Sequence, residues 1–314
     1  MTTITLAPPA PTAAANATKA RPLLSISLLA LVWGSTFFWT AIAGEGASPA
    51  QIVFIRLALA SLVLIGFVYS KGLRLPKDFT TWRHLTTAAL MANAAPWLLF
   101  SIGVQEAGSS MAGTINATTP LWTVAFLLIW RHEKRVGASR AIGLALGIAG
   151  VVLVAAPWQN GISSGVIYFV IAAAMFGASF AYTARHLTNT GNPPLVTAAG
   201  QLFAATVLSA LVLPFTGWPS IQLDTSVIVA LLMLGILVTA FGYVLSLHIV
   251  AESGAASAST VAFMVPVVAV ALGIVFLHET FTVPMAIGGI ITLVGAGLVR
   301  RRPKQNNEPS QPQT

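Results

Sequence analysis

Ten long stretches of this sequence hold about 20 mostly apolar residues each, and they constrain the fold more than any other feature. A helix needs roughly 20 apolar residues to cross a hydrocarbon core about 30 Å thick. Isolated apolar strands would leave backbone groups unpaired in lipid, so the stretches predict helices. We expect ten transmembrane helices, at residues 23–43, 50–70, 84–104, 109–130, 139–156, 163–185, 194–215, 226–249, 255–277 and 283–299.

The composition excludes a soluble fold and several kinds of chemistry. Hydrophobic residues make up 56% of the chain and charged residues only 8%, whereas a soluble domain has roughly a quarter of its residues charged. The chain has no cysteine, which excludes disulfides and thiolate-bound zinc. The five histidines form no i, i+4 ligand pair, so we expect no metal and no cofactor.

The distribution of basic residues predicts the orientation in the membrane, because Lys and Arg collect in cytoplasmic loops. With ten spans both ends of the chain lie on one side. If that side is the cytoplasm, 15 of the 16 basic residues lie inside, and the sixteenth, Arg56, lies within the second span. We therefore expect a multi-pass membrane protein with cytoplasmic termini.

The second half of the sequence repeats the first at a displacement of about 143 to 146 residues. Residues 34–40 match 177–183, 106–110 match 252–256, Pro120 matches Pro266, and 132–133 match 278–279. Each copy holds five spans, an odd number, so the copies should be inverted, as in many secondary transporters. We divide the chain into repeats at 22–157 and 158–302, flanked by disordered cytoplasmic tails at 1–21 and 303–314.

The sequence resembles the EamA family of the drug/metabolite transporter superfamily. The resemblance covers residues 23–301 and rests on Trp-Gly-Ser-Thr-Phe at 33–37, Arg56 after Phe54, residues 116–120, and Pro266 with 278–279. It implies an all-α membrane protein, with a central cavity lined by spans one, three, four, six, eight and nine and alternating access between its halves. Within the family, the sequence is most similar to bacterial exporters of amino acids, including aromatic ones. With the topology, this resemblance implies a location in the bacterial inner membrane.

Polar and amphipathic side chains within the spans are candidates for the transport path, because they are unfavourable in lipid. Amides, hydroxyls and aromatic rings together suit a small zwitterion with an apolar side chain. The alternative is that such side chains bridge packed helices. The candidate substrate-binding residues are Trp33, Thr36, Thr40, Asn93, Trp97, Asn116, Thr119, Ser179, Tyr182, Thr239 and Tyr243.

Three further residues stand out in the spans. Pro120 and Pro266 should bend spans four and nine at matching positions and are candidate hinges, the alternative being prolines kept for shape alone. Arg56 has no carboxylate within the spans, and we interpret it as a structural charge that reaches toward the membrane surface. Binding of a substrate carboxylate is its alternative role, which Gln201 at the matching position of the second copy disfavours.

These features predict a secondary transporter and not an enzyme. The sequence has no G-x-x-x-x-G-K-[ST] phosphate loop. The eight acidic residues lie in tails, loops or span ends, which favours facilitated diffusion or exchange. We expect a monomer that exports aromatic or other neutral amino acids and binds no nucleic acid. The alternatives are export of drugs or other metabolites, exchange of phosphorylated metabolites, and an integral-membrane enzyme acting on lipid.

Overall fold

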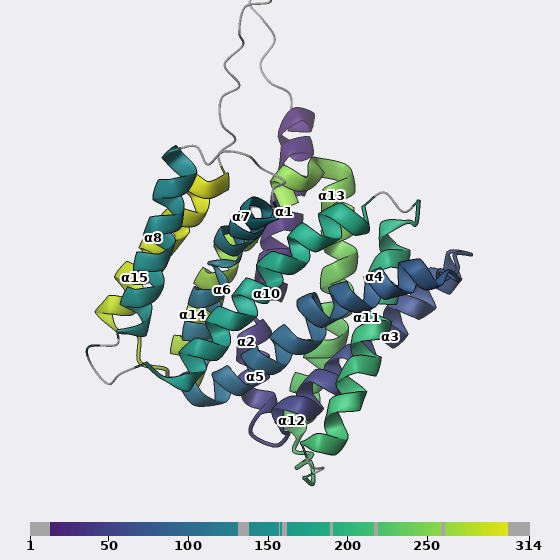
Figure 1. Cartoon of the computed structure of the whole chain (residues 1–314), viewed down its shortest axis with the longest axis horizontal. Helices are drawn as coiled ribbons and strands as arrows, with labels where there is room; N and C mark the ends of the chain where they lie inside the picture. Colours follow the sequence, from purple (N-terminus) through teal and green to yellow (C-terminus); the bar gives the residue numbers. More distant parts are fainter. Residues whose placement is uncertain are drawn as a thin grey trace, which may run out of the picture.

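The computed structural model describes residues 13–130, 138–156, 158, 162–188, 191–216, 219–258 and 261–300. These residues form a bundle of helices joined by short connections (Figure 1). Two segments, η1 and η3, are π-helical, and η2 is a 3-10 turn. The helical elements are α1 (Ala13–Gly34), α2 (Thr36–Ala43), α3 (Pro49–Ser70), α4 (Phe79–Ala89), η1 (Leu90–Ala94), α5 (Ala95–Ala107), α6 (Ser109–Asn116), α7 (Thr119–Ile129), α8 (Ala138–Ala155), α10 (Ser164–His186), α11 (Pro194–Val212), η2 (Leu213–Phe215), α12 (Thr225–Leu232), η3 (Met233–Phe241), α13 (Gly242–Ala258), α14 (Val261–Leu277) and α15 (Val283–Arg300).

Eight helical segments of the described chain are long and apolar enough to cross a membrane, so this is a multi-pass membrane protein. They correspond in position to the first eight expected spans. Several are built from consecutive elements, such as Phe79–Ala107 from α4, η1 and α5. Two shorter apolar helices, Val261–Leu277 and Val283–Val299, lie where the ninth and tenth spans are expected.

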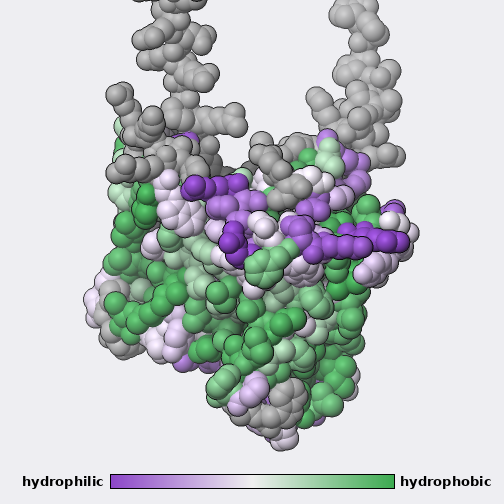
Figure 2. Space-filling view, turned by 45° about the vertical axis from the view of Figure 1, so that its right-hand side comes forward, coloured by the Kyte–Doolittle hydropathy of each residue, from purple (hydrophilic) through white to green (hydrophobic). Residues whose placement is uncertain are grey.

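The distribution of side chains is that of a protein surrounded by lipid. Large aliphatic residues in the middle of helices are exposed, as at Leu62 (69%), Ile148 (67%) and Ile290 (63%), whereas the polar Arg56 and Asn93 are buried. Figure 2 shows hydrophobic residues over a broad band of one face, and hydrophilic residues gathered toward one end. The band is the surface expected against acyl chains.

Helices α8 and α15 stand side by side at one edge of the bundle (Figure 1). They are antiparallel, since Gly143 lies against Gly295 and Gly150 against Gly288. A Cβ added at Gly150 would lie 2.2 Å from Thr292 Oγ1 and 2.7 Å from the Gly288 carbonyl oxygen. Small residues therefore bring the two backbones into contact, as is common between membrane helices.

Two helices begin earlier than the hydropathy pattern predicts. Helix α1 starts at Ala13, within the segment expected to be a disordered tail, and its first three residues are alanines, the best helix formers. Helix α4 starts at Phe79, after the N-cap residue Asp78, whose Oδ2 accepts the Thr81 amide hydrogen at 2.7 Å. Hydrogen bonds from the side chain and backbone of Thr81 hold the pKa of Asp78 below its usual value.

Glu279 joins the two halves of the chain at the start of α6. Its Oε1 accepts the Ser109 amide hydrogen at 2.6 Å, and its Oε2 accepts that of Ser110 at 2.8 Å. Because the first amides of a helix have no partner within it, this carboxylate caps α6 across 170 residues of sequence. The matching pair in the first copy, residues 132–133, lies outside the described residues.

Candidate functional site

The third and eighth membrane-spanning helices each contain a π-helical segment, η1 and η3. The two segments occupy matching positions in the sequence repeat, because a displacement of 146 residues relates Asn93 to Thr239 and Trp97 to Tyr243. A π-helical segment widens the helix and redirects side chains, and such segments are frequent at functional sites. Four of the candidate residues therefore lie in or beside the two irregular segments.

Arg56 of α3 crosses to the second of these segments. Its side chain is only 3% exposed. Nε donates a hydrogen bond to Thr239 Oγ1 at 2.7 Å, and the guanidinium carbon lies 3.7 Å from the centre of the Trp97 ring. Thr239 Oγ1 in turn donates to the Leu234 carbonyl oxygen at 2.7 Å, five residues back along η3. The hydroxyl is thereby turned to accept from Arg56, and the indole face stabilises the cation.

Asn93 and Tyr243 complete this group of residues. The Tyr243 hydroxyl donates to Asn93 Oδ1 at 3.1 Å. Asn93 is 1% exposed, and its Nδ2 has no hydrogen-bond partner among the described residues. Arg56, Asn93, Trp97, Thr239 and Tyr243 are called the Arg56 cluster below. The cluster joins α3, η1, α5, η3 and α13 inside the bundle.

The position of Arg56 differs from the expected reach toward the membrane surface. The side chain turns inward, because Thr239 and the Trp97 ring offer it a hydrogen bond and a cation–π contact there. Among the described residues it forms no ion pair, and its two Nη atoms have no hydrogen-bond partner. The guanidinium therefore presents unused donors within the protein.

An aromatic group borders the cluster and consists of Phe37, Trp97, Phe100 and Phe176. Trp97 meets Phe176 edge-on with ring centres 5.3 Å apart, and Phe37 lies 5.1 Å from Phe100. Phe37 and Phe100 are each 1% exposed and belong to the core, whereas Trp97 and Phe176 are partly exposed. Trp97 thus has a polar neighbourhood on one side and an aromatic one on the other.

Several predicted hydroxyls are bonded to a backbone carbonyl of their own span. Thr40, Thr119 and Ser179 each donate to a backbone carbonyl three or four residues back, at 2.8, 2.8 and 2.7 Å. Asn116 Oδ1 also accepts from Thr119 Oγ1, at 3.3 Å. Thr36 is 2% exposed at the start of α2. Each of these bonded hydroxyls therefore uses its single O–H on a local carbonyl, and it donates neither to a neighbouring span nor to a ligand.

Tyr182 lies apart from the Arg56 cluster, whereas Trp33 contacts the residue that precedes Tyr243 of the cluster. Trp33 packs over Gly242, where an added Cβ would be 2.5 Å from its Nε1. The Tyr182 hydroxyl lies 2.7 Å from His84 Nδ1, and its ring stacks on His186 with centres 4.4 Å apart. His84 precedes Asn93 by nine residues, or about 13 Å of helix. Tyr182 therefore belongs to a separate group nearer the helix ends.

The two candidate hinge prolines have different surroundings. The fourth span is interrupted between α6 and α7, and Pro120 occupies the first turn of α7, where a missing amide hydrogen matters least. Pro266 instead lies inside α14, which continues through it. The sequence repeat predicted equivalent bends, and the structure places a break at one proline and an unbroken helix at the other.

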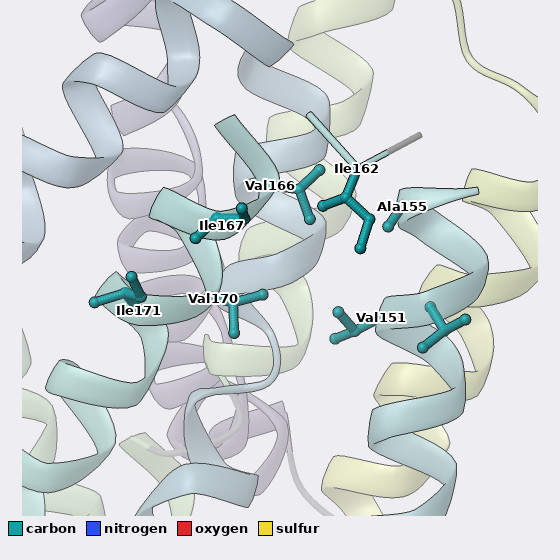
Figure 3. A pocket seen from close by; sticks show the side chains of 8 residues that line it. Val151, Ala155, Ile162, Val166, Ile167, Val170 and Ile171 are labelled. Atoms are coloured by element: carbon teal, nitrogen blue, oxygen red, sulfur yellow. The ribbon is translucent and has the colours of Figure 1, made fainter. Parts of the chain in front are cut away.

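The crevice in Figure 3 belongs to the lipid-facing surface and contains none of the candidate residues. It lies between α8 and α10 and is lined only by aliphatic side chains, including Val151, Val166 and Ile171. A second crevice, between α3 and the η3–α13 helix, is also mainly apolar. Within the described residues no group of three or more His, Cys, Asp or Glu side chains is placed to hold a metal.

Sequence reasoning missed two parts of the site. The π-helical segments were not expected, and Phe176 was not among the candidates. The sequence did hold a signal for the π-helical segments, because the 146-residue displacement pairs Asn93 with Thr239 and Trp97 with Tyr243. The pairing marks two equivalent helices without revealing their hydrogen-bond pattern.

An apolar exterior around a buried polar cluster defines an integral membrane protein with an internal polar site. Residues 20–156 and 163–301 each match the model of the EamA-like transporter family. The chain therefore belongs to the EamA-like transporter family, which confirms the resemblance seen in the sequence.

Relatives from two bacteria match most of the chain. The uncharacterized transporter YdfC of Bacillus subtilis is 23% identical over 275 residues, which are 87% of this chain and 89% of YdfC. The uncharacterized inner membrane transporter YedA of Escherichia coli K12 is 26% identical over 258 residues, 78% of this chain and 79% of YedA. A crystal structure with 20% sequence identity matches 90% of this chain and 97% of its own, with a TM-score of 0.63, and shows the same fold.

Proposed function

We propose that the protein is a secondary transporter that exports amino acids with aromatic or other neutral side chains across the bacterial inner membrane. The observation that carries the proposal is the Arg56 cluster, in which charged, amide and aromatic groups are buried between helices whose outer faces are apolar. Relatives named as transporters, one of them in the inner membrane, support the location and the class.

The proposed architecture is ten membrane-spanning helices with cytoplasmic termini, arranged as two inverted repeats. The family model matches the chain twice, and the π-helical segments fall at equivalent places in the two matches. Five spans in each repeat would invert the second copy. Exchange of conformation between inverted halves would then open the central site to each side of the membrane in turn.

The amino-acid substrate follows from the chemistry of the cluster and its border. A guanidinium and an amide N–H group are donors for a carboxylate, and the partly exposed rings of Trp97 and Phe176 offer a surface for an apolar side chain. We propose facilitated diffusion or exchange as the mechanism, because the acidic residues lie in tails, loops and span ends.

Counterflow into liposomes tests this function. Purified protein is reconstituted into vesicles loaded with unlabelled phenylalanine, tryptophan, leucine, a nucleoside or an organic cation, and uptake of the matching labelled compound is followed. We expect saturable uptake of the amino acids above that of protein-free vesicles, and no uptake of the cation. Uptake of the cation or the nucleoside without any amino acid would refute the proposed substrate.

A further inference from the structure

We propose that the Arg56 cluster recognises its substrate through a carboxylate and has no charged partner for an ammonium group. The substrate class is then monocarboxylates with an apolar or aromatic side chain, including those that lack an amino group. This inference rests on the proposed function in one respect, that the cluster lies on the transport path.

The free hydrogen-bonding groups of the cluster are nearly all donors. Arg56 uses Nε on Thr239, which leaves the four N–H groups of its two Nη atoms without a partner among the described residues. Asn93 Nδ2 adds two more N–H groups. The acceptor oxygens of Asn93 and Thr239 already accept from Tyr243 and Arg56. A guanidinium fork with free N–H groups matches the geometry of a carboxylate, and the free amide of Asn93 belongs to the same cluster.

A purely structural role explains the contacts of Arg56 less well. Burying a cation without an anion is unfavourable, and an uncharged side chain can join helices at lower cost. An uncharged side chain occupies the matching position in the second repeat, where Gln201 is 8% exposed and its Nε2 lies 3.5 Å from the Ala88 carbonyl oxygen. The charge at Arg56 is therefore not needed for packing alone, and a bound carboxylate would balance it.

No acidic side chain of the described chain is bonded to the cluster. Glu279 accepts two amides of α6, Glu106 accepts from Ser164, and Glu252 pairs with His248. Asp78 caps α4, and the remaining described acids, Glu45 and Asp224, lie in connections between helices. The cluster thus carries the positive charge of Arg56 alone, which attracts an anion and repels an amine.

Two truncated analogues of phenylalanine separate the contributions of its charged groups. In the liposome assay, unlabelled 3-phenylpropionate, which keeps the carboxylate, and 2-phenylethylamine, which keeps the ammonium, compete with labelled phenylalanine. We expect 3-phenylpropionate to compete within about tenfold of phenylalanine and 2-phenylethylamine not to compete, because hydrogen bonds to a charged group change affinity by about 10- to 100-fold.

Variants then assign the effect to the cluster. Arg56→Met should weaken 3-phenylpropionate binding by about 10- to 100-fold. Arg56→Lys keeps the positive charge but lacks the planar fork of N–H groups, so it should retain part of the affinity for 3-phenylpropionate. Gln201→Met, a buried change at the matching position, is the control and should bind as the wild type does. Asn93→Asp, which adds a carboxylate to the Arg56 cluster, should no longer bind 3-phenylpropionate and should begin to bind 2-phenylethylamine.

Thermal unfolding in detergent provides a readout independent of transport. We expect 3-phenylpropionate to raise the unfolding temperature of the wild type and of Gln201→Met, but not that of folded Arg56→Met. If Arg56→Met does not fold, Arg56→Lys and Asn93→Asp decide the question. Equal competition by both analogues, or unchanged 3-phenylpropionate binding in the Arg56 and Asn93 variants, would overturn the inference.

The same measurements separate the two proposals. Suppose that phenylalanine is transported, but that competition by the two analogues is the same in the wild type and the Arg56 variants. The carboxylate site is then refuted and the transport function stands. If no amino acid is transported while 3-phenylpropionate stabilises the protein through Arg56, the amino-acid substrate is refuted and the carboxylate site stands.

Discussion

Removing the Glu279 carboxylate should loosen the connection between the two halves of the chain. Glu279 follows α14, and its two oxygens accept the amide hydrogens of Ser109 and Ser110 at the start of α6, at 2.6 and 2.8 Å. The sequence positions are 170 and 169 residues apart, so the contact is entirely tertiary. Glu279→Ala deletes both hydrogen bonds, and Glu279→Gln keeps one acceptor oxygen without the charge.

The expected loss follows from the two bonds and their exposure. A hydrogen bond to a charged group contributes about 1.5–3 kcal/mol when its partners stay dry. Glu279 is partly exposed, so water replaces part of what the amides lose. We therefore expect Glu279→Ala to lower the free energy of unfolding by about 2–4 kcal/mol, and Glu279→Gln by about 1–2 kcal/mol.

Reversible unfolding in mixed micelles, with increasing anionic detergent, measures this difference. Glu252→Ala is the matched control, because its carboxylate is paired with His248 at an exposed site, and such pairs contribute about 0–1 kcal/mol. If Glu279→Ala were no more destabilising than Glu252→Ala, the carboxylate would not be a cap that joins the two halves.

Two other changes test packing inside the bundle. Tyr243→Phe removes the hydroxyl bonded to Asn93, so it should lower the free energy of unfolding by about 1–3 kcal/mol in the same assay, and a neutral result would argue against that bond. Gly150→Ala would bring its new methyl group 2.2 Å from Thr292 Oγ1 and 2.7 Å from the Gly288 carbonyl oxygen, so it should lower the unfolding midpoint by forcing α8 from α15. Gly66→Ala, where nothing lies within 4 Å, is its control and should not lower the midpoint; equal effects would show that the contact between α8 and α15 is not tight.

The positions of the spans and four residues of the cluster could be predicted from sequence because lipid imposes a strong pattern. A lipid-facing helix must be apolar over about 20 residues, so ten stretches stand out. Asn93, Trp97, Thr239 and Tyr243 stand out for the converse reason, since amphipathic groups in a span need protein or water around them. The structure brings all four together.

The remaining features depend on contacts that no local pattern encodes. The hydroxyls of Thr40 and Ser179 bond to their own helices, and whether a hydroxyl does this or faces a cavity depends on its rotamer. Pro120 and Pro266 match in the repeat, yet only the fourth span breaks. Arg56 points inward because Thr239, 183 residues later, is placed to accept from it.

The two repeats differ in charge at the Arg56 cluster, and this difference affects how a transport site there would work. Asn93 and Thr239 match in sequence, as do Trp97 and Tyr243, but the charge of Arg56 has only an amide, Gln201, as its counterpart. In an inverted-repeat transporter the halves exchange conformations, so identical halves would bind the substrate equally well in both states. Arg56 belongs to the first half and bonds to Thr239 of the second, so a rearrangement that moves α3 against η3 would change this bond. A single charge on one half thus allows the two states to bind a carboxylate with different affinities, which a symmetric pair would not.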